Sequence, residues 1–196
     1  MDKRKATAIA LASATAFIWG LSFLSIKTAV AVIPPMTLGL ARFIVGSIVL
    51  LLVYFMRGRK PRLAARDAPL MAGAGLMGVT LYFLGENNGV LLLSASEASI
   101  IVGTIPVITM LSERLILRTR LGGAQYTGAG LSAIGVTLIV VESLRVSPSP
   151  SGYLYMGLAA LSWVAYSFMT KPLLTSYDSL DVTLWQSVFG DRKSVV

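Results

Sequence analysis

Long apolar stretches follow one another along the chain, and each is close to the length that a helix needs to cross a lipid bilayer. The hydrocarbon core is about 30 Å thick, so at a rise of about 1.5 Å per residue a spanning helix needs about 20 residues. Six runs meet this requirement and a seventh is too short; they cover about residues 7–33, 36–56, 69–93, 94–117, 124–141, 153–174 and 182–189. The sequence therefore predicts an all-α polytopic membrane protein, with about six transmembrane helices and part of a seventh.

Charged residues are scarce in this chain. Only 13% of its 196 residues are charged, about half the share of an ordinary soluble domain, which excludes a water-soluble globular surface. The 55% hydrophobic content equally excludes disorder. The absence of cysteine and histidine removes disulfides, the usual zinc and haem ligands, and thiol or imidazole catalysis. We therefore expect no metal site, no cofactor and no enzymatic activity.

The positive charges are grouped in the segments that separate the apolar runs, and the net charge is +8 at pH 7. If each run crosses the membrane once, three basic segments fall on one side and only Arg145 on the other. The three segments hold Lys3, Arg4 and Lys5; Arg57, Arg59, Lys60, Arg62 and Arg66; and Arg114, Arg118 and Arg120. By the positive-inside rule this side, with the N-terminus, is cytoplasmic. We expect no nucleic-acid partner, because no polar basic domain with interleaved aromatic residues is present.

A weak internal repeat relates the first run to the sixth. Trp19 is followed eight positions later by Lys27, and Trp163 is followed eight positions later by Lys171. Because five helices separate the two copies, the second copy must cross the membrane in the opposite direction. Inverted repeats of this kind are typical of secondary transporters, whose substrate site lies near the repeat interface.

Four groups of residues stand in a specific order and spacing along the chain. They are Ile18-Trp-Gly20 with Lys27; Pro35 followed by Ala41-Arg42-Phe43; Leu93-Ser-Ala-Ser-Glu-Ala-Ser99 followed by Pro106; and Gln125-Tyr-Thr-Gly128 leading into Ala133-Ile-Gly135-Val136. Together they resemble the EamA-like family of the drug/metabolite transporter superfamily. The resemblance implies a helical bundle of two inverted five-helix halves, ten helices in all, with both termini in the cytoplasm, which agrees with the orientation argued from charge.

The resemblance also implies a division of the chain. Residues 1–145 would form the first five-helix EamA-like repeat, 146–152 a linker loop, and 153–190 a partial second repeat. The last six residues, 191–196, do not continue the seventh helix and resemble read-through of a sequencing adaptor. We therefore expect a C-terminally truncated member of the family, and whether the residues after Gly190 are native stays open.

One position departs from the family pattern within the first repeat. Thr119 stands where the family usually carries a glutamate, directly before the pair Arg120-Leu121. A capping or topology role at that position is therefore absent or has moved, for example to Glu113.

Four charged side chains within the predicted helices fall in the outer half of the bundle. They are Lys27, Arg42, Glu86 and Glu97. Each charge inside a membrane costs about 2.5–3.5 kcal/mol on insertion scales, so each is a functional hypothesis. In a purely structural interpretation Lys27 reaches outward to the membrane surface, Arg42 pairs with Glu86, and Glu97 caps its helix. In a functional one, Arg42 or Lys27 meets a substrate carboxylate or phosphate, with Glu86 as partner or proton acceptor. The sequence leaves both open.

Central aromatic and amide side chains are further candidates for a substrate or ion pathway. Trp19, Tyr82 and Trp163 would either line a cavity or pack against neighbouring helices and lipid. Asn87 and Asn88 would either bind polar groups of a substrate or form hydrogen bonds across helices.

Proline and glycine mark expected features of the helices. Pro106 lies mid-helix and removes one backbone hydrogen bond, which makes it either a structural kink or a gating hinge. Small residues spaced four apart let helix backbones approach each other. Two such faces are expected to pack closely, one with Gly73, Gly75 and Gly78, the other with Ala124, Gly128 and Ser132.

These features favour a secondary active transporter of a small metabolite or drug-like compound across the cytoplasmic membrane, an exporter that works by alternating access. Its partners would be the lipid bilayer and a small-molecule substrate, with protons as the simplest coupling ion through Glu86. Two alternatives remain open: a non-transporting membrane scaffold and a membrane-embedded lipid-modifying enzyme. A homodimer would be needed to close a pathway if the native protein were this short. The substrate itself is not identified by the sequence.

Overall fold

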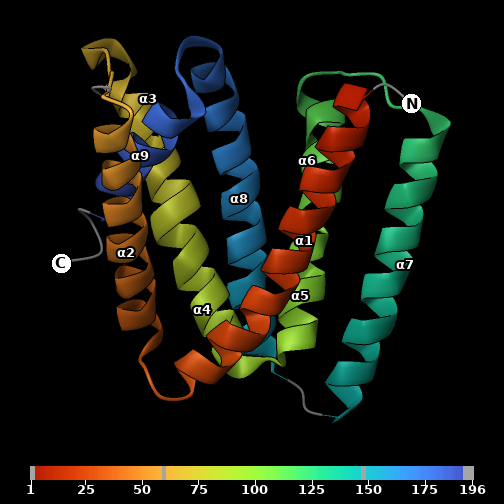
Figure 1. Cartoon of the computed structure of the whole chain (residues 1–196). Coiled ribbons are helices and arrows are strands. Elements are labelled where there is room, and N and C mark those ends of the chain that lie inside the picture. Colours follow the sequence, from red (N-terminus) through yellow and green to blue (C-terminus); the bar gives the residue numbers. More distant parts are fainter. Residues whose placement is uncertain (1–2, 59–60, 147–148, 192–196) are drawn as a thin grey trace.

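The computed structural model of the chain describes residues 3–58, 61–146 and 149–191 (Figure 1). Nearly all of these residues are helical and none of them forms a strand, which confirms the all-α class. Residues 192–196, whose origin the sequence leaves open, lie outside the described residues. The elements are α1 (Lys3–Val30), α2 (Pro35–Met56), the 3₁₀ turn η1 (Ala65–Asp67), α3 (Ala68–Gly75), the π-helical turn η2 (Leu76–Leu81), α4 (Tyr82–Leu92), α5 (Ala95–Gly103), α6 (Ile105–Ile116), α7 (Gly123–Val146), α8 (Pro150–Ser176) and α9 (Ser179–Asp191).

Five helical stretches in the described part of the chain are long and apolar enough to cross a membrane. They are Ile9–Val30, Pro35–Met56, Ala65–Leu92, Ala95–Ile116 and Gly123–Glu142. The third joins η1, α3, η2 and α4 into one span, and the fourth joins α5 and α6. At 27 residues α8 has the length of a spanning helix but is not one of the five, so the sixth expected span stays a prediction.

The start of α8 differs from the sequence-based expectation. Residues 150–152 were assigned to a linker loop, whereas the helix already begins at Pro150. Proline is favoured in the first turn of a helix, because its fixed φ suits the helix and its missing N–H would have no intrahelical partner there. Pro35 begins α2 for the same reason.

Successive helices alternate in direction, and their connections gather at two ends of the bundle (Figure 1). We call the end at which α1 begins the N-terminal face; the connections from α2 to α3, from α6 to α7 and from α8 to α9 lie there too. The connections from α1 to α2 and from α4 to α5 lie at the opposite face, whereas α3 passes into α4, and α5 into α6, within a span. As the internal repeat requires, α8 therefore runs in the opposite direction to α1.

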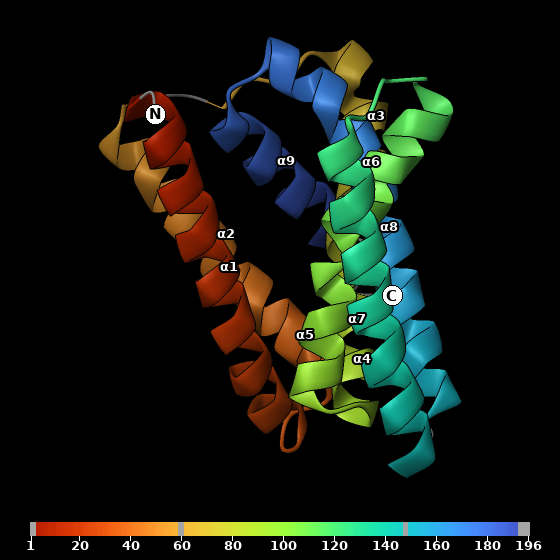
Figure 2. The same cartoon turned by 90° about the vertical axis from the view of Figure 1, so that its right-hand side faces the viewer.

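Two apolar cores hold the helices together. The first joins α1, α4, α5 and α8, with Phe23, Val30, Val90 and Met156 among its buried side chains. The second joins α3, α8 and α9 around Met71 and carries partly buried aromatic side chains. Figure 2 shows α1 approaching the other helices near the opposite face and diverging from α6 and α8 toward the N-terminal face, where α2 stays in contact with α9. The first core thus closes the bundle toward the opposite face.

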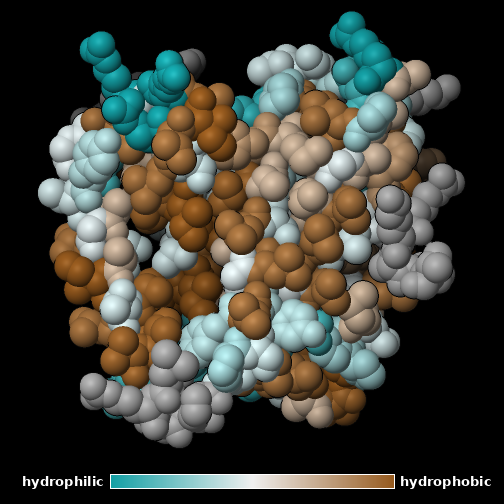
Figure 3. All heavy atoms as spheres, turned by 180° about the vertical axis from the view of Figure 1, so that it is seen from behind, coloured by the Kyte–Doolittle hydropathy of each residue, from teal (hydrophilic) through white to brown (hydrophobic). Residues whose placement is uncertain are grey.

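Apolar side chains also cover the outside of the protein. Phe55 is 86% exposed and Val32 84% exposed, and many other large apolar side chains on α1, α2 and α7 are exposed. In Figure 3 hydrophobic residues cover most of the visible face, while strongly hydrophilic ones gather at its upper edge, which is the N-terminal face. A surface of this kind suits contact with lipid rather than water.

The two faces of small residues behave differently. A Cβ atom at Gly75 would lie 2.5 Å from the Gln186 carbonyl oxygen on α9, and one at Gly78 would lie 2.3 Å from the Tyr166 ring on α8, so the predicted close packing of α3 and η2 is confirmed. A Cβ atom at Gly128 would meet no atom within 4 Å. The predicted packing of that face of α7 is therefore wrong for the described part of the chain, because no other described helix covers it.

Candidate functional site

A cavity of about 850 Å³ lies between α1, α5, α6 and α8. Aromatic side chains of Trp19, Phe23 and Trp163 form part of its wall, and most of the remaining lining residues are small or apolar. The predicted hinge Pro106 lines it as well. The other residues predicted for the pathway, Lys27, Arg42, Tyr82, Glu86 and Asn87, are not among its lining residues.

Three of the predicted aromatic residues touch one another across three helices. The rings of Trp19 on α1 and Trp163 on α8 meet edge to face with 5.8 Å between centroids. The Tyr82 ring on α4 lies 4.7 Å from the Trp163 ring, and Tyr166 lies 5.0 Å from it on the other side. The aromatic wall is therefore shared between α1, α4 and α8.

Behind this wall lies a buried charged group. Arg42 Nη1 on α2 donates to Glu86 Oε2 on α4 at 3.2 Å, and the Tyr82 hydroxyl donates to Glu86 Oε1 at 2.9 Å. Tyr82 and Glu86 are four residues apart, so both lie on one face of α4. Glu86 is only 4% exposed, and Asn87 lies within 3.5 Å of Arg42 Nη1. The ion pair that the sequence suggested is therefore present.

Arg42 also faces a second hollow. It lines a cavity of about 440 Å³ between α1 and α2, with Ser22, Ser25 and Leu38 among the other lining residues. Its guanidinium carbon lies 4.7 Å from the centroid of the Phe83 ring, a cation–π contact. The chain Tyr82–Glu86–Arg42 therefore leads from the Trp163 side of the aromatic wall to this second hollow.

The Lys27 side chain reaches the end of α4 at the opposite face, and its reach to the membrane surface stays a prediction. Its Nζ donates to the carbonyl oxygens of Val90, Leu91 and Leu93 at 2.9, 3.0 and 2.7 Å. These carbonyls lie at the end of α4, where backbone acceptors lack intrahelical partners and the helix dipole favours a cation. Lys27 therefore ties α1 to the end of α4.

We expect Lys27→Met to destabilise the protein by about 2 kcal/mol, because hydrogen bonds to charged groups contribute about 1.5–3 kcal/mol and the freed carbonyls lie partly buried. Thermal unfolding of the purified protein in detergent measures this loss. Lys27→Arg is the control, since it keeps the positive charge; equal stability of the wild type and Lys27→Met would contradict the capping role.

The two asparagines and Glu97 take different partners. Asn87 Nδ2 donates across helices to the Pro35 carbonyl oxygen at 3.0 Å, whereas Asn88 Nδ2 donates to Leu84 O one turn back on its own helix. The cross-helix expectation thus holds for Asn87 and is wrong for Asn88.

Glu97 completes the predicted capping box with Ser94, and it also accepts a hydrogen bond at 2.6 Å from the hydroxyl of Tyr153 on α8.

The backbone breaks next to Pro106, as predicted. α5 ends at Gly103 and α6 begins at Ile105, with Thr104 between them. The hydroxyls of Thr104 and Thr109 donate to the carbonyl oxygens of Ile101 and Ile105, at 2.6 and 2.9 Å. Both side chains therefore satisfy backbone acceptors near the break, and its function as a hinge stays a prediction.

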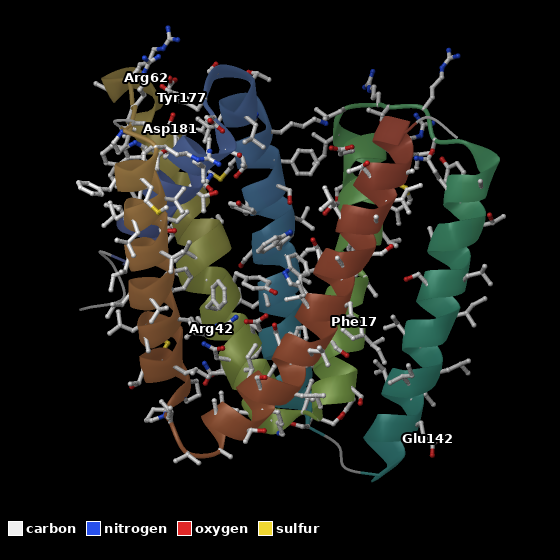
Figure 4. All side chains as sticks on the ribbon, in the orientation of Figure 1. Phe17, Arg42, Arg62, Glu142, Tyr177 and Asp181 are labelled. Carbon is white, nitrogen blue, oxygen red and sulfur yellow. The ribbon has the colours of Figure 1, made fainter. Side chains whose placement is uncertain are left out.

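Sequence reasoning missed a polar network at the N-terminal face. The Tyr54 hydroxyl and the Arg62 backbone N–H both donate to Asp181 Oδ1 on α9, and the Tyr177 hydroxyl donates to Asp67 Oδ2. That last hydrogen bond raises the pKa of the Tyr177 phenol above its ordinary value. Figure 4 shows Arg62, Tyr177 and Asp181 close together at this face. The available signal was the presence of carboxylates, Asp67 and Asp181 among them, on a mostly cationic side of the chain.

A second missed contact joins α6 to α8. Lys171 Nζ lies 2.8 Å from Glu113 Oε1, and Glu113 lines the main cavity. The sequence singles out Lys171 only by its place in the repeat, and Glu113 only as a possible substitute for the glutamate that Thr119 replaces. Nothing in their spacing of 58 positions indicated that the two would meet.

Comparison with known proteins supports the resemblance seen in the sequence. A family model described as the EamA-like transporter family matches residues 6–141. The chain is 30% identical over 172 residues to a probable terminal-alkyne amino-acid exporter of Streptantibioticus cattleyicolor, covering 87% of this chain and 57% of the relative. It is 28% identical over 179 residues to an uncharacterized transporter of Archaeoglobus fulgidus, covering 90% and 62%.

A further relative is an uncharacterized inner membrane transporter of Escherichia coli, 27% identical over 185 residues, covering 89% of this chain and 57% of the relative. The chain thus spans about three-fifths of the length of these relatives. No solved structure gives a significant match. The family match covers more than half of the residues and agrees with the apolar helices of a multi-pass membrane protein. The chain therefore belongs to the EamA-like transporter family.

Proposed function

We propose that the full protein is a secondary active transporter that exports a small solute by alternating access, with the 850 Å³ cavity as its solute site. The observation that carries the proposal is the aromatic wall: Trp19 and Trp163 occupy related positions in the two repeats and meet edge to face at 5.8 Å. A solute in the cavity contacts both repeats at once. Its binding can therefore favour one arrangement of the repeats over another, which alternating access requires.

The described arrangement supports a specific conformational state. The first apolar core closes the bundle near the opposite face, and α1 diverges from α6 and α8 toward the N-terminal face (Figure 2). If the positive-inside rule sets the orientation, the N-terminal face is cytoplasmic, and this state receives solute from the cytoplasm. The break between α5 and α6 at Pro106 borders the cavity, so a change of angle there would alter its shape.

We further propose that proton movement drives export through Glu86. Glu86 is buried, and Arg42 and Tyr82 bind its two carboxylate oxygens. An ionisable group inside a membrane is costly and is retained mostly for function. When Glu86 takes up a proton, its attraction to Arg42 weakens and α2 becomes freer to move relative to α4. The second hollow beside Arg42 provides room for this movement.

The rival functions have less support. A lipid-modifying enzyme needs a nucleophile, a base or a metal cluster; the sequence has no histidine or cysteine, and no cluster of metal-ligating side chains occurs among the described residues. A non-transporting scaffold would not need a cavity with an aromatic wall shared between the repeats. Family membership also favours transport over both.

Transport by the full protein in proteoliposomes tests the proposal. We expect uptake of at least one solute from a panel of radiolabelled amino acids, nucleosides and organic acids, above that of protein-free liposomes. An imposed pH gradient should increase the uptake, and collapse of the gradient with a protonophore should abolish the increase. A protein that moves no solute in either direction, with or without the gradient, would not be a transporter of this kind. If uptake is the same with and without the pH gradient, protons do not drive transport.

A further inference from the structure

A cavity of about 690 Å³ lies at the N-terminal face, apart from the proposed solute site. It lies between the end of α2, the chain that follows α2, and the connection from α8 to α9. Its charged lining residues are two arginines and two aspartates: Arg57, Arg62, Asp178 and Asp181. Figure 4 shows Arg62 and Asp181 at this face. None of these residues takes part in the proposed transport mechanism, so the cavity has no assigned role.

The two aspartates of this cavity have partners, whereas the two arginine side chains do not. Asp181 is 9% exposed, and its Oδ1 accepts hydrogen bonds from the Tyr54 hydroxyl and the Arg62 backbone N–H. Asp178 accepts a hydrogen bond from the hydroxyl of the next residue at 3.4 Å and takes part in a further interaction. In the part of the chain that the structure describes, the side chains of Arg57 and Arg62 have no hydrogen bond or ion pair. The charge that this cavity offers to a ligand is therefore positive.

The backbone fixes the positions of both arginines. Arg57 directly follows α2, and Gly58 after it has a φ of +58°, a left-handed conformation that ends helices and favours glycine. The Arg62 backbone is held on both sides. Its N–H donates to Asp181, and its carbonyl oxygen accepts from the indole N–H of Trp185 at 3.1 Å. The cavity is therefore a built feature of the fold, formed where the end of α2 meets α9.

Strongly exposed apolar side chains stand directly before Arg57. Phe55 is 86% exposed and Met56 is 84% exposed at the end of α2. They lie between an apolar span and a basic segment, at the level where lipid tails meet lipid headgroups. A ligand with a charged group in the cavity can therefore keep apolar chains in contact with these two residues.

We propose that this cavity binds the phosphate group of an anionic phospholipid, with Arg57 and Arg62 as the phosphate-binding residues. A guanidinium group presents a planar fork of N–H donors that matches the oxygens of a phosphate. The acyl chains of the lipid lie along the end of α2, over Phe55 and Met56. If the positive-inside rule sets the orientation, this face meets the cytoplasmic leaflet, whose anionic lipids attract basic segments.

A general attraction between basic segments and an anionic membrane is the alternative to a defined site. Arg118 and Arg120, between α6 and α7, lie at the same face, are exposed as well and do not line this cavity. A general attraction predicts that this pair of arginines contributes as much to lipid binding as Arg57 and Arg62. A defined site depends on Arg57 and Arg62 alone.

Displacement of a labelled lipid from the purified full protein tests the proposal. Radiolabelled dioctanoyl-phosphatidylglycerol is bound to the protein in a neutral detergent and displaced by the same lipid without label, by dioctanoyl-phosphatidylcholine, by glycerol phosphate or by inorganic phosphate. We expect phosphatidylglycerol to compete at least about tenfold better than phosphatidylcholine, which has no net charge. Glycerol phosphate and inorganic phosphate should compete at least about a hundredfold less well, a factor that burial of a few acyl CH₂ groups accounts for.

Each contrary result identifies the part of the proposal that is wrong. Equal competition by the two lipids would show that the arginines do not recognise the net charge. Competition by inorganic phosphate as strong as that by phosphatidylglycerol would show that the cavity binds free phosphate rather than a lipid. No saturable binding of phosphatidylglycerol would overturn the site altogether.

Two double variants distinguish the defined site from general attraction. Arg57→Gln/Arg62→Gln should lower the affinity for phosphatidylglycerol to that for phosphatidylcholine. The contacts of Arg62 that hold the fold are made by its backbone, so this variant keeps them. Arg118→Gln/Arg120→Gln is the matched control, because it removes the same charge from the same face, and it should bind phosphatidylglycerol as the wild type does. An equal loss of affinity in both double variants would overturn the defined site.

Thermal unfolding gives a second measurement that needs no label. A ligand of the native state raises the thermal midpoint, so phosphatidylglycerol should raise it in the wild type and in the control variant but not in Arg57→Gln/Arg62→Gln. An equal rise in all three proteins would show that the lipid stabilises the protein elsewhere. The lipid site and the transport function are tested separately, since none of these measurements involves transport.

Discussion

Arg42→Gln is expected to abolish transport by the full protein and to destabilise it by about 3 kcal/mol at neutral pH. The substitution leaves Glu86, which is 4% exposed, without its cationic partner. Removing one member of a buried ion pair costs about 3–5 kcal/mol, because the remaining charge stays buried and uncompensated. The lower end of this range applies here, because the Arg42 side chain is 35% exposed and the pair is therefore only partly shielded from solvent. Solute uptake into proteoliposomes and unfolding in detergent measure the two effects.

The double variant Arg42→Gln/Glu86→Gln separates stability from function. It replaces the ion pair with two neutral amides, so most of the lost stability should return. Transport should not return, because no group remains at position 86 to take up a proton. Undiminished transport by Arg42→Gln, at normal protein level and membrane insertion, would remove Arg42 from the pathway. If proton-driven transport recovers in the double variant, Glu86 is not the proton acceptor.

Gly85→Ala should prevent correct packing of α4 against α8. A Cβ atom at Gly85 would lie 2.6 Å from the Tyr155 carbonyl oxygen and 2.8 Å from the Ala159 backbone nitrogen. Both are backbone atoms of α8, so no side-chain rotation relieves the clash. Overpacking costs about 1–3 kcal/mol, and the better helix propensity of alanine recovers at most about 1 kcal/mol. We expect a net loss of about 2 kcal/mol, or failure to fold, measured as the monodisperse fraction in detergent and its thermal midpoint.

Gly130→Ala is the matched control for this substitution. Gly130 lies on α7, where a Cβ atom would meet no atom within 4 Å. The same change of residue should therefore leave the protein as stable as the wild type, or more stable by up to about 1 kcal/mol. If both variants lose the same stability, close approach of α4 and α8 is not the cause. A wild-type level of folded Gly85→Ala would show that α8 can shift outward without loss.

Some contacts followed directly from local sequence patterns. The capping box of Ser94 and Glu97 needs only a spacing of three residues at a helix start, and the structure has it. The break at Pro106 follows from a missing N–H and a ring that clashes with the preceding turn, and α5 and α6 do separate there. Tyr82 and Glu86 share one face of α4 because they are four residues apart.

Other contacts needed the three-dimensional arrangement. Nothing in the sequence indicated the partners of Lys27, which are three carbonyl oxygens at the end of α4. Asn88 differs from Asn87 only in the direction in which it leaves the helix, and so it binds its own backbone. Glu113 and Lys171 are 58 positions apart and meet only because α6 packs on α8.

The sequence by itself determined that this protein is a bundle of membrane helices, that it belongs to the EamA-like family and that its helices carry rare buried charges. Helix length, apolar content and the charges within apolar runs depend on residues that are neighbours in the sequence. A family pattern depends on the order and spacing of residues. These properties can therefore be predicted from the sequence alone. Only the tertiary structure decided which charges pair, which small residues touch and where the cavity lies. Those features depend on distances between helices, which are set by the packing of side chains far apart in the sequence.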